Sequence, residues 1–250
     1  MRGGVWTGGE AMTYCVGLLL NAGMVLLSDT RTNAGLDNIS VYKKMFTFEQ
    51  PGERIIVIMT AGSLSVTQTT IARLHDAIDN PEAEAESVLA APTMLRVAEI
   101  VGNTLSCVAR DVAVKLGSMS QNASATMIVA GQRMGGGMRM FLVYPEGNFI
   151  ESTADTPFLQ IGEHKYGKPI LDRVVSMETS LSDAQKAVLL SMDSTMRSNL
   201  SVGMPLDLCV VKEGEMSAVT RRIEADDDVF HRMSADWSNA LRDAFTDIEI

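Results

Sequence analysis

Apolar and polar positions follow two different periods along this chain, and each period predicts a different kind of element. Near the start, apolar runs at 13–20 and 24–29 flank the tight turn Asn21-Ala22-Gly23, which indicates a hairpin of two strands. Other short apolar runs that are bounded by turn residues predict further strands. These runs occupy 41–48, 54–60, 125–130, 138–144, 148–152, 158–161, 206–211 and 216–220.

Helical spacing of apolar residues marks five other segments. The clearest is 94–116, where apolar positions recur every three or four residues through about six turns. A second helix is predicted over 63–78, and a third over 166–173. A fourth is predicted over 182–198 with Ser182 as its N-cap, and a final amphipathic helix follows the acidic residues 226–228.

The order of these elements predicts the fold class. Strands come in groups joined by hairpins, which makes them antiparallel, and pairs of helices separate the groups. Runs such as VGLLL and IIVIM do not alternate, so both faces of these strands are expected to be buried. We therefore expect an α+β fold of two stacked antiparallel sheets flanked by helices, a four-layer αββα sandwich. It would form a single domain over 13–250, after an N-terminal extension at 1–12 that is disordered or removed.

Composition narrows the classes of partner and location. The chain has 250 residues with a net charge of −10 and no basic cluster, which argues against nucleic acid as a partner. No apolar run reaches the roughly 18 residues that span a bilayer, so a membrane partner is not expected. Cys15, Cys107 and Cys209 lie far apart in apolar runs, which favours buried free thiols in a reducing compartment. These features and the absence of a secretion signal indicate a cytoplasmic protein.

Several familiar chemistries find no support in the sequence. His75, His164 and His231 lie in separate predicted elements, and the chain has no G-x-S-x-G elbow, so a Ser-His-Asp site is not indicated. No histidine or cysteine pair has the spacing of a metal site, and no cofactor is predicted.

Thr13, Asp29 and Lys44 remain as candidates for chemistry. Asp29 and Lys44 lie within or at the ends of strands that we expect in one sheet. A charge in such a position needs a partner, and each of these residues can supply one to the other. On these residues alone, two interpretations stay open. The residues could form a structural ion pair, or they could be part of a catalytic site.

Three stretches of the sequence resemble a known family. They are MTYCVGLLLNAGMVLLSDTRTNAGLDNISVYKKMFTF from Met12, IMTAGSLSVTQ from Ile58, and GEHKYGKPILDR from Gly162. From Met12 onward, the chain is similar to the proteasome-type N-terminal nucleophile hydrolases, and within them to the bacterial Anbu branch of proteasome-like beta subunits. The resemblance implies the N-terminal nucleophile hydrolase fold.

The resemblance also assigns candidate roles by position. Thr13 matches the nucleophile that begins the mature chain, Asp29 the family aspartate, and Lys44 the family lysine. The lysine match requires a one-residue deletion after Gly35, so Lys43 is the alternative. Gly62 matches the glycine whose backbone N–H binds the oxyanion.

Two positions depart from the family pattern. The segment Ser198-Asn199-Leu200-Ser201 matches one that carries an aspartate and a serine near the amine of the nucleophile. Ser201 matches that serine, whereas Ser198 stands where the aspartate is expected. A supporting serine in a Gly-Ser-Gly turn is replaced here by Gly162-Glu163. These departures bear on the tuning of the amine, and with it on full peptidase activity.

The function implied is a threonine hydrolase that cleaves peptide bonds, with the α-amine of Thr13 as its base. The resemblance also implies a homo-oligomer, either a ring or an open spiral of six or twelve subunits, and a peptide substrate of unspecified sequence. An ATPase partner is neither indicated nor excluded. Two alternatives stay open, which are a self-assembling scaffold with little peptidase activity and an amidase for a non-protein amide.

Overall fold

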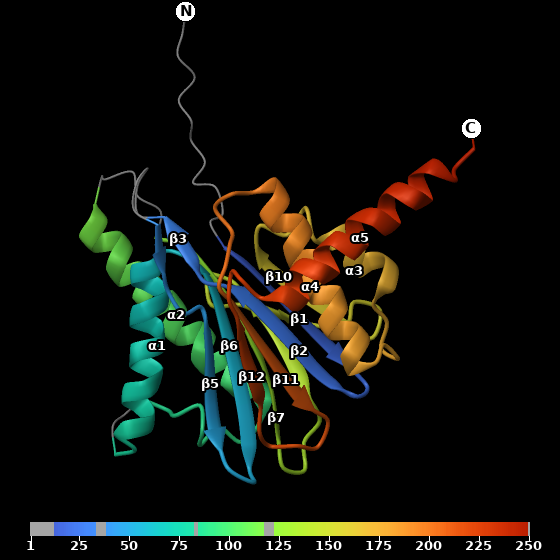
Figure 1. The fold of residues 1–250 in the computed structure, drawn as a ribbon. Helices are drawn as coiled ribbons and strands as arrows, with labels where there is room; N and C mark the ends of the chain where they lie inside the picture. The colour runs from blue at the N-terminus through green and yellow to red at the C-terminus, as the bar shows by residue number, and fades with distance from the viewer. Residues whose placement is uncertain (1–12, 34–38, 83–84, 118–122, 250) are drawn as a thin grey trace, which may run out of the picture.

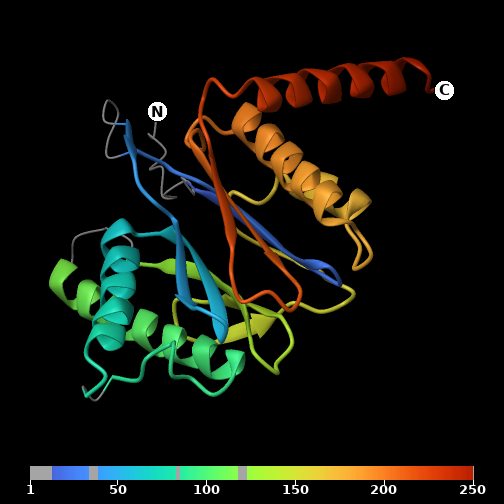
Figure 2. The same ribbon diagram turned by 60° about the horizontal axis from the view of Figure 1, so that its bottom comes forward.

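The computed structural model describes residues 13–33, 39–82, 85–117 and 123–249, and the predicted extension at 1–12 lies outside them. Two five-stranded antiparallel sheets stack face to face in the centre (Figures 1 and 2). The first sheet, in the order β10-β1-β2-β11-β12, consists of Phe158–Gly162, Tyr14–Leu20, Gly23–Asp29, Leu206–Lys212 and Val219–Ile223. The second, in the order β5-β6-β7-β8-β9, consists of Met45–Gln50, Arg54–Gly62, Ala125–Arg133, Arg139–Val143 and Phe149–Glu151.

Helices cover the outer face of each sheet. On the second sheet lie α1 (Leu64–Asp79) and α2 (Met94–Leu116). On the first lie α3 (Lys168–Val174), α4 (Leu181–Ser198) and the beginning of α5 (Asp228–Thr246). The predicted α+β class and its four layers are therefore confirmed.

The central strands are buried on both faces, as their continuous apolar runs predicted. Along β1, Val16 and Leu18 face α4, whereas Cys15 faces the second sheet. Between the two sheets, Gly17 lies where an added Cβ would stand 2.7 Å from the sulfur of Met140. The missing side chain therefore lets the sheets approach closely.

The strand predicted over 41–48 is wrong, because the chain forms two strands there. Residues 39–41 form β4 (Ile39–Val41), which pairs with the unpredicted β3 (Arg31–Asn33), whereas β5 pairs with β6. Between them, the backbone N–H of Tyr42 donates to the carbonyl of Thr30 at 2.9 Å. The chain thus passes from one strand pair to another at 42–44, and Lys44 lies at this crossing.

Other boundaries shift by a few residues. β7 continues to Arg133, into the segment between two predicted strands, and the strand predicted over 216–220 lies at Val219–Ile223. Ser180, and not Ser182, caps α4, because the Ser180 Oγ accepts a hydrogen bond from the Asp183 N–H at 3.1 Å. Ser180 precedes the first helical residue, which is the position where a hydroxyl can reach an unpaired amide.

The sequence predicted three buried free thiols and no membrane-spanning segment. All three cysteines are free, but only Cys15 and Cys209 are buried, whereas Cys107 is partly exposed on α2. In the part of the chain that the structure describes, no helix combines the length and the apolar character needed to cross a bilayer.

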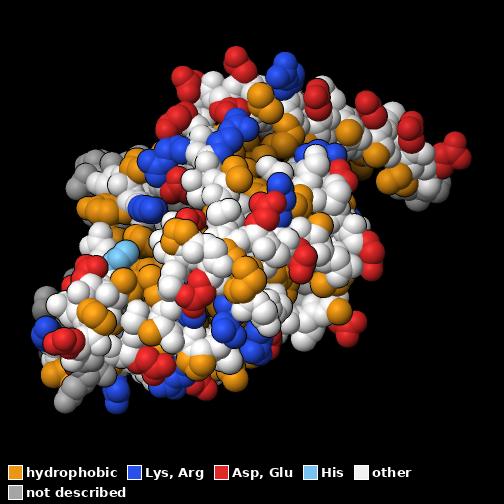
Figure 3. All heavy atoms as spheres, turned by 90° about the horizontal axis from the view of Figure 1, so that it is seen from below, with side chains coloured by type: hydrophobic (Ala, Val, Ile, Leu, Met, Phe, Trp, Pro, Cys, Tyr) orange, Lys and Arg blue, Asp and Glu red, His pale blue; other side chains and the backbone are white. Residues whose placement is uncertain are grey.

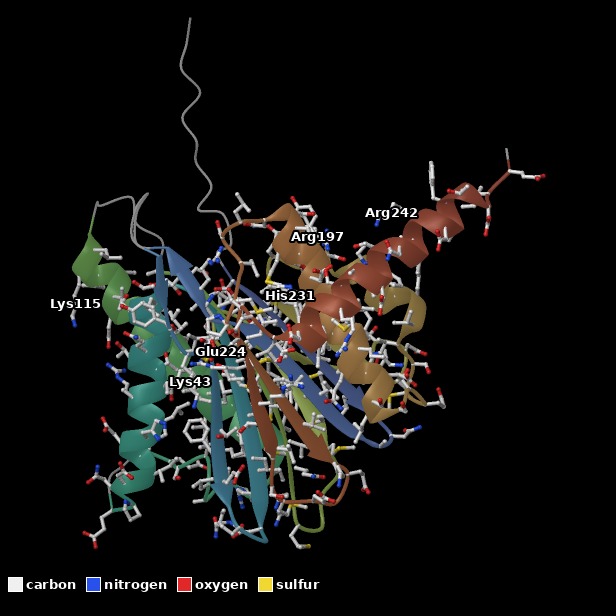
Figure 4. All side chains as sticks on the ribbon, viewed as in Figure 1. Lys43, Lys115, Arg197, Glu224, His231 and Arg242 are labelled. Atoms are coloured by element: carbon white, nitrogen blue, oxygen red, sulfur yellow. The ribbon has the colours of Figure 1, made fainter. Side chains whose placement is uncertain are left out.

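Only the first half of α5 packs against the body of the protein. Phe230 is buried, and the Ser234 hydroxyl donates to Asp193 on α4 at 2.8 Å and accepts from Arg197 at 2.7 Å. Figure 4 shows Arg197 near the end of α4 and Arg242 much further out along α5. The second half of α5 projects beyond the sandwich (Figures 1 and 2).

Candidate active site

Asp29 is a fully buried carboxylate at the end of β2, in the middle of the first sheet. Its Oδ1 accepts hydrogen bonds from Lys44 Nζ at 2.9 Å and from the Tyr14 N–H at 3.1 Å. Its Oδ2 accepts a longer bond from the Gly203 N–H at 3.4 Å. Both oxygens are therefore satisfied, as a buried charge requires.

Lys44 is the cation of this site and is 5% exposed. Besides Asp29, its Nζ donates to the carbonyl of Arg31 at 2.6 Å. Its own carbonyl accepts from the Thr60 N–H of β6 at 2.9 Å. Contacts with β2, β3 and β6 therefore fix Lys44 where the chain crosses between strand pairs.

Thr13 immediately precedes β1 and is 7% exposed. Its carbonyl accepts from the Glu163 N–H at 2.7 Å. The neighbouring Gly162 has φ +79°, and a Cβ there would lie 1.9 Å from the Thr13 oxygen, so only glycine fits. The peptide nitrogen that follows Thr13 is the Tyr14 N–H, which binds the same Asp29 oxygen as Lys44. The structure thus brings Thr13, Asp29 and Lys44 together.

Lys43, the alternative lysine, points elsewhere. It is exposed, and its Nζ lies 5.6 Å from the centre of the Phe46 ring. Figure 4 shows Lys43 next to β5. There it lines a cavity of about 180 Å³ together with Asp207 and Arg221. Successive side chains of an extended chain point to opposite sides, so Lys43 and Lys44 diverge. The ion pair with Asp29 is made by Lys44.

Burial sets the protonation of the groups around the site. It raises the pKa of the Asp29 carboxyl from 3.8 to about 6, although Lys44 and the amides of Tyr14 and Gly203 lower it. It also raises the pKa of the Tyr14 phenol to about 12, against the effect of the Ser191 and Gln160 hydrogen bonds. The pKa of the Cys15 thiol is raised by burial as well. At neutral pH Asp29 is therefore anionic, while Tyr14 and Cys15 are neutral.

Gly62 ends β6 with a backbone that only glycine adopts readily. Its φ is +105°, and a Cβ would lie 2.5 Å from the carbonyl oxygen of Ser124. Amides along an antiparallel strand point alternately to its two neighbours. The Thr60 N–H donates to the Lys44 carbonyl. The Gly62 N–H, two residues further along β6, therefore points to the same side of the strand, beyond the point where the pairing with β5 ends. This amide is directed toward the end of the sheet that holds Lys44.

Ser198 and Ser201 lie less directly at this site. Ser198 is the exposed last residue of α4, and Ser201 donates its backbone N–H to Asn199 Oδ1 at 2.9 Å. Among the described hydrogen bonds, none joins either serine to Thr13. Their loop still reaches the site, because Gly203 follows Ser201 closely and donates to Asp29.

Sequence reasoning missed part of the framework that holds these residues. The contacts of Asp29 with the Tyr14 and Gly203 amides were not predicted. Glu163 was considered only as a departure from a family pattern, yet it holds the Thr13 carbonyl and accepts from Asn199 Nδ2 at 3.3 Å. The signal that the sequence offered was the glycine at position 203. The structure gives the reason for this glycine, since a Cβ there would lie 2.5 Å from the guanidinium carbon of Arg31.

Other cavities and clusters do not coincide with the site. A cavity of about 1190 Å³ lies between α1 and α2, and its lining includes none of the predicted site residues. Within the described ranges, no group of three or more histidine, cysteine, aspartate or glutamate side chains is arranged to hold a metal ion.

Comparisons with known proteins relate the chain to solved structures. No protein-family model and no curated protein matches it. The Gly-1 mutant of Anbu from Hyphomicrobium sp. strain MC1 is 45% identical over 95% of this chain and 98% of that chain, with a TM-score of 0.87. Anbu (ancestral beta-subunit) from Yersinia bercovieri is 40% identical over 95% of this chain and 99% of that chain, with a TM-score of 0.89. The chain in a helical assembly of the Anbu complex from Pseudomonas aeruginosa is 42% identical over 95% of this chain and 98% of that chain, with a TM-score of 0.89.

Proposed function

The chain belongs to the Anbu family of proteasome-like beta subunits, and on this premise we propose that it is an N-terminal threonine hydrolase that cleaves peptide bonds. The observation that carries the proposal is the single Asp29 oxygen shared by Lys44 and the amide that follows Thr13. This contact brings a buried cation to a hydroxyl-bearing residue at the end of the sheet.

The reaction needs a base, because a threonine hydroxyl is a poor nucleophile at neutral pH. A free α-amine on Thr13, with an ordinary pKa of about 8, can be that base. The hydroxyl proton passes to this amine as Oγ1 attacks the substrate carbonyl carbon. The C–N bond then breaks, and the leaving amine takes the proton. Water finally hydrolyses the ester, which releases a carboxylic acid and regenerates Thr13.

The charged groups support this reaction electrostatically. The ammonium of Lys44 favours the developing alkoxide on Thr13, and Asp29 orients that ammonium. The Gly62 N–H is assigned to the oxyanion of the tetrahedral intermediate. One such donor contributes about 3 to 4 kcal/mol to lowering the barrier.

The mechanism requires that Thr13 be the first residue of the working chain. In a peptide bond with Met12, the Thr13 nitrogen accepts no proton, and the site has no base. We therefore propose that the bond between Met12 and Thr13 is absent from the active form.

An electrophile selective for N-terminal threonine tests this function. A chain that begins at Thr13 should acquire one adduct, located at Thr13 by peptide mass spectrometry. Thr13→Ala should assemble normally but form no adduct and turn over no peptide, whereas Thr13→Ser should keep both properties. An adduct located on another residue, or full turnover by Thr13→Ala, would rule out the proposed nucleophile.

One observation favours a scaffold with little peptidase activity as the second candidate. Ser198 stands where the resemblance implies an aspartate, and it is exposed. For a scaffold, Thr13 would stay unmodified by the electrophile in an otherwise intact assembly. If Thr13 reacts but a peptide library is not cleaved, the amidase for a non-protein amide is favoured instead.

The outer half of α5 supports homo-assembly of this chain. Phe230, Trp237, Leu241 and Phe245 recur at helical spacing, so the stripe that is buried at Phe230 continues into the projecting part. Leu241 is 51% and Phe245 80% exposed. Figure 3 shows this arm with apolar side chains along one side and acidic ones along the other.

A second copy of the chain is the occupant we propose for this stripe, because a relative from Pseudomonas aeruginosa forms a helical assembly. A contact between different surfaces of identical subunits builds a ring if its rotation closes and an open spiral if it does not.

A further inference from the structure

The working chain of the proposed hydrolase carries a charge that the described contacts leave unassigned. A free α-amine on Thr13 is an ammonium for part of the time, and Thr13 is only 7% exposed. A charge in so enclosed a position needs a counter-charge or hydrogen-bond acceptors. This charge exists only when the amine is free, so a role for its counter-anion rests on the proposed function.

Most charged groups around Thr13 are already engaged elsewhere. Asp29 binds Lys44 and two amides. Arg31 donates from its guanidinium to the Leu200 carbonyl at 2.9 Å. His164 is exposed, with its Nδ1 3.2 Å from the carbonyl oxygen of Gly162. Lys44 is a cation, and its proximity disfavours a second positive charge.

Glu163 is the carboxylate that the backbone brings to Thr13. The left-handed conformation of Gly162 turns the chain so that the Glu163 N–H reaches the Thr13 carbonyl at 2.7 Å. The Glu163 side chain is half-buried, and its Oε2 accepts from Asn199 Nδ2 at 3.3 Å. Among the described residues, no donor binds Oε1. One carboxylate oxygen is thus anchored by the loop after α4, while the other is available.

We propose that Glu163 is the anion that faces the α-amine of Thr13 once this amine is free. It acts as a positioning residue, which holds the ammonium and orients the nitrogen toward the Thr13 hydroxyl. Asn199 in turn orients the carboxylate. The charge that Ser198 does not supply at the end of α4 is supplied by Glu163, the residue after β10, whose carboxylate accepts from Asn199 at that helix end.

This arrangement has a consequence for the strength of the base. Burial and the nearby Lys44 both make the amine less basic, because both disfavour its charged form. A carboxylate opposes these two effects and keeps the basicity of the amine near the working pH, where a general base is most effective. Removing the negative charge should therefore weaken the base without removing the nucleophile.

The test uses chains that begin at Thr13 and carry ¹⁵N-labelled threonine, in the wild type, Glu163→Gln and Glu163→Asp. The α-amine pKa is measured by NMR titration, and the rate of electrophile addition at Thr13 is measured across pH. Glu163→Gln should lower the pKa of the amine by about 1 unit and shift the acid limb of the rate profile equally. Glu163→Asp should recover part of this shift. The exposed Glu213→Gln is the matched control and should change neither quantity.

The outcomes separate this inference from the function on which it rests. If Glu163→Gln reacts at Thr13 with an unchanged amine pKa, Glu163 is not the counter-anion, while the hydrolase stands. If the wild-type chain never reacts at Thr13, the hydrolase and the role of Glu163 fall together. Equal thermal unfolding of the wild type and Glu163→Gln, with a shifted pKa, excludes a merely structural role.

Discussion

The Thr13 end of the first sheet and the outer half of α5 differ in what they bury. At the sheet end, Asp29 and Lys44 form an ion pair at 2.9 Å and are almost completely buried. On α5, Leu241 and Phe245 are apolar and more than half exposed. One region removes charge from water, and the other leaves apolar surface in it. Both arrangements cost free energy in an isolated chain.

Neither region is explained by the stability of one subunit. A buried ion pair is often replaceable by apolar side chains without loss of stability, so its presence points to a role in chemistry. An exposed apolar stripe on a projecting helix points to a surface that another molecule covers. Variants that affect one region and leave the other unchanged test this division.

The largest effect is expected from Lys44→Ala. It removes the cation beside Thr13, and turnover should fall about 10³-fold, which corresponds to about 4 kcal/mol in the activation barrier. Lys43→Ala is the matched control, because Lys43 is exposed and points away from Asp29; its turnover should stay within about twofold of the wild type. Both variants should assemble like the wild type. Equal losses in the two variants would contradict the assignment of Lys44.

Asp29→Asn should have the next largest effect, on activity. It removes the anion that orients Lys44, so turnover should fall about 10²-fold. The free energy of unfolding at pH 7 should fall by no more than about 1 kcal/mol, because the neutral amide avoids the cost of a buried carboxylate whose pKa burial raises to about 6. Turnover assays and denaturant titrations measure the two effects. A large loss of stability with unchanged turnover would show that the pair serves folding and not catalysis.

The α5 stripe should affect assembly and not the subunit itself. Leu241→Ser with Phe245→Ser should dissociate the assembly in analytical ultracentrifugation. The free energy of unfolding of the subunit should change by less than about 0.5 kcal/mol, because both side chains are exposed. Val219→Ser on β12 is the matched control, since Val219 is 68% exposed but lies off α5. Assembly that survives in the double variant would place the interface elsewhere.

The smallest effect is expected from pH. The unfolded chain releases the Asp29 proton near pH 4, whereas the folded chain keeps it to about pH 6. Between these values the folded state binds more protons, so the contribution of Asp29 to the free energy of unfolding falls as pH rises. The ion pair with Lys44 forms only above about pH 6, so turnover should rise through that pH.

Unfolding titrations at pH 4, 5, 6 and 7 on the wild type and Asp29→Asn measure the Asp29 contribution. The difference in stability between the two proteins should change over this window and level off above it. A difference that is constant across the window would show that burial does not raise the Asp29 pKa.

Much of the fold could be predicted because its strongest patterns are local. The helical repeat over 94–116 and the apolar run over 54–60 each fix an element without reference to the rest of the chain. The predicted strand over 41–48 failed because its interruption is tertiary. Lys44 turns inward to meet Asp29 and the carbonyl of Arg31, and no local pattern shows this.

The site shows the same limit. Thr13, Asp29 and Lys44 could be identified as candidate site residues through a family resemblance, and their catalytic roles remain predictions. The bond from Gly203 to Asp29 joins residues far apart in the sequence, as does the bond from Asn199 to Glu163. Such contacts depend on how the loop after α4 packs against the sheet, which neither periodicity nor composition encodes.

The most direct test of the central claim is the mass of the N-terminal peptide in the assembly that carries peptidase activity. We predict a chain that begins at Thr13 with an unmodified α-amine. Full activity in an assembly whose subunits begin upstream of Thr13, or whose Thr13 nitrogen is acylated, would contradict the proposal that this amine is the base.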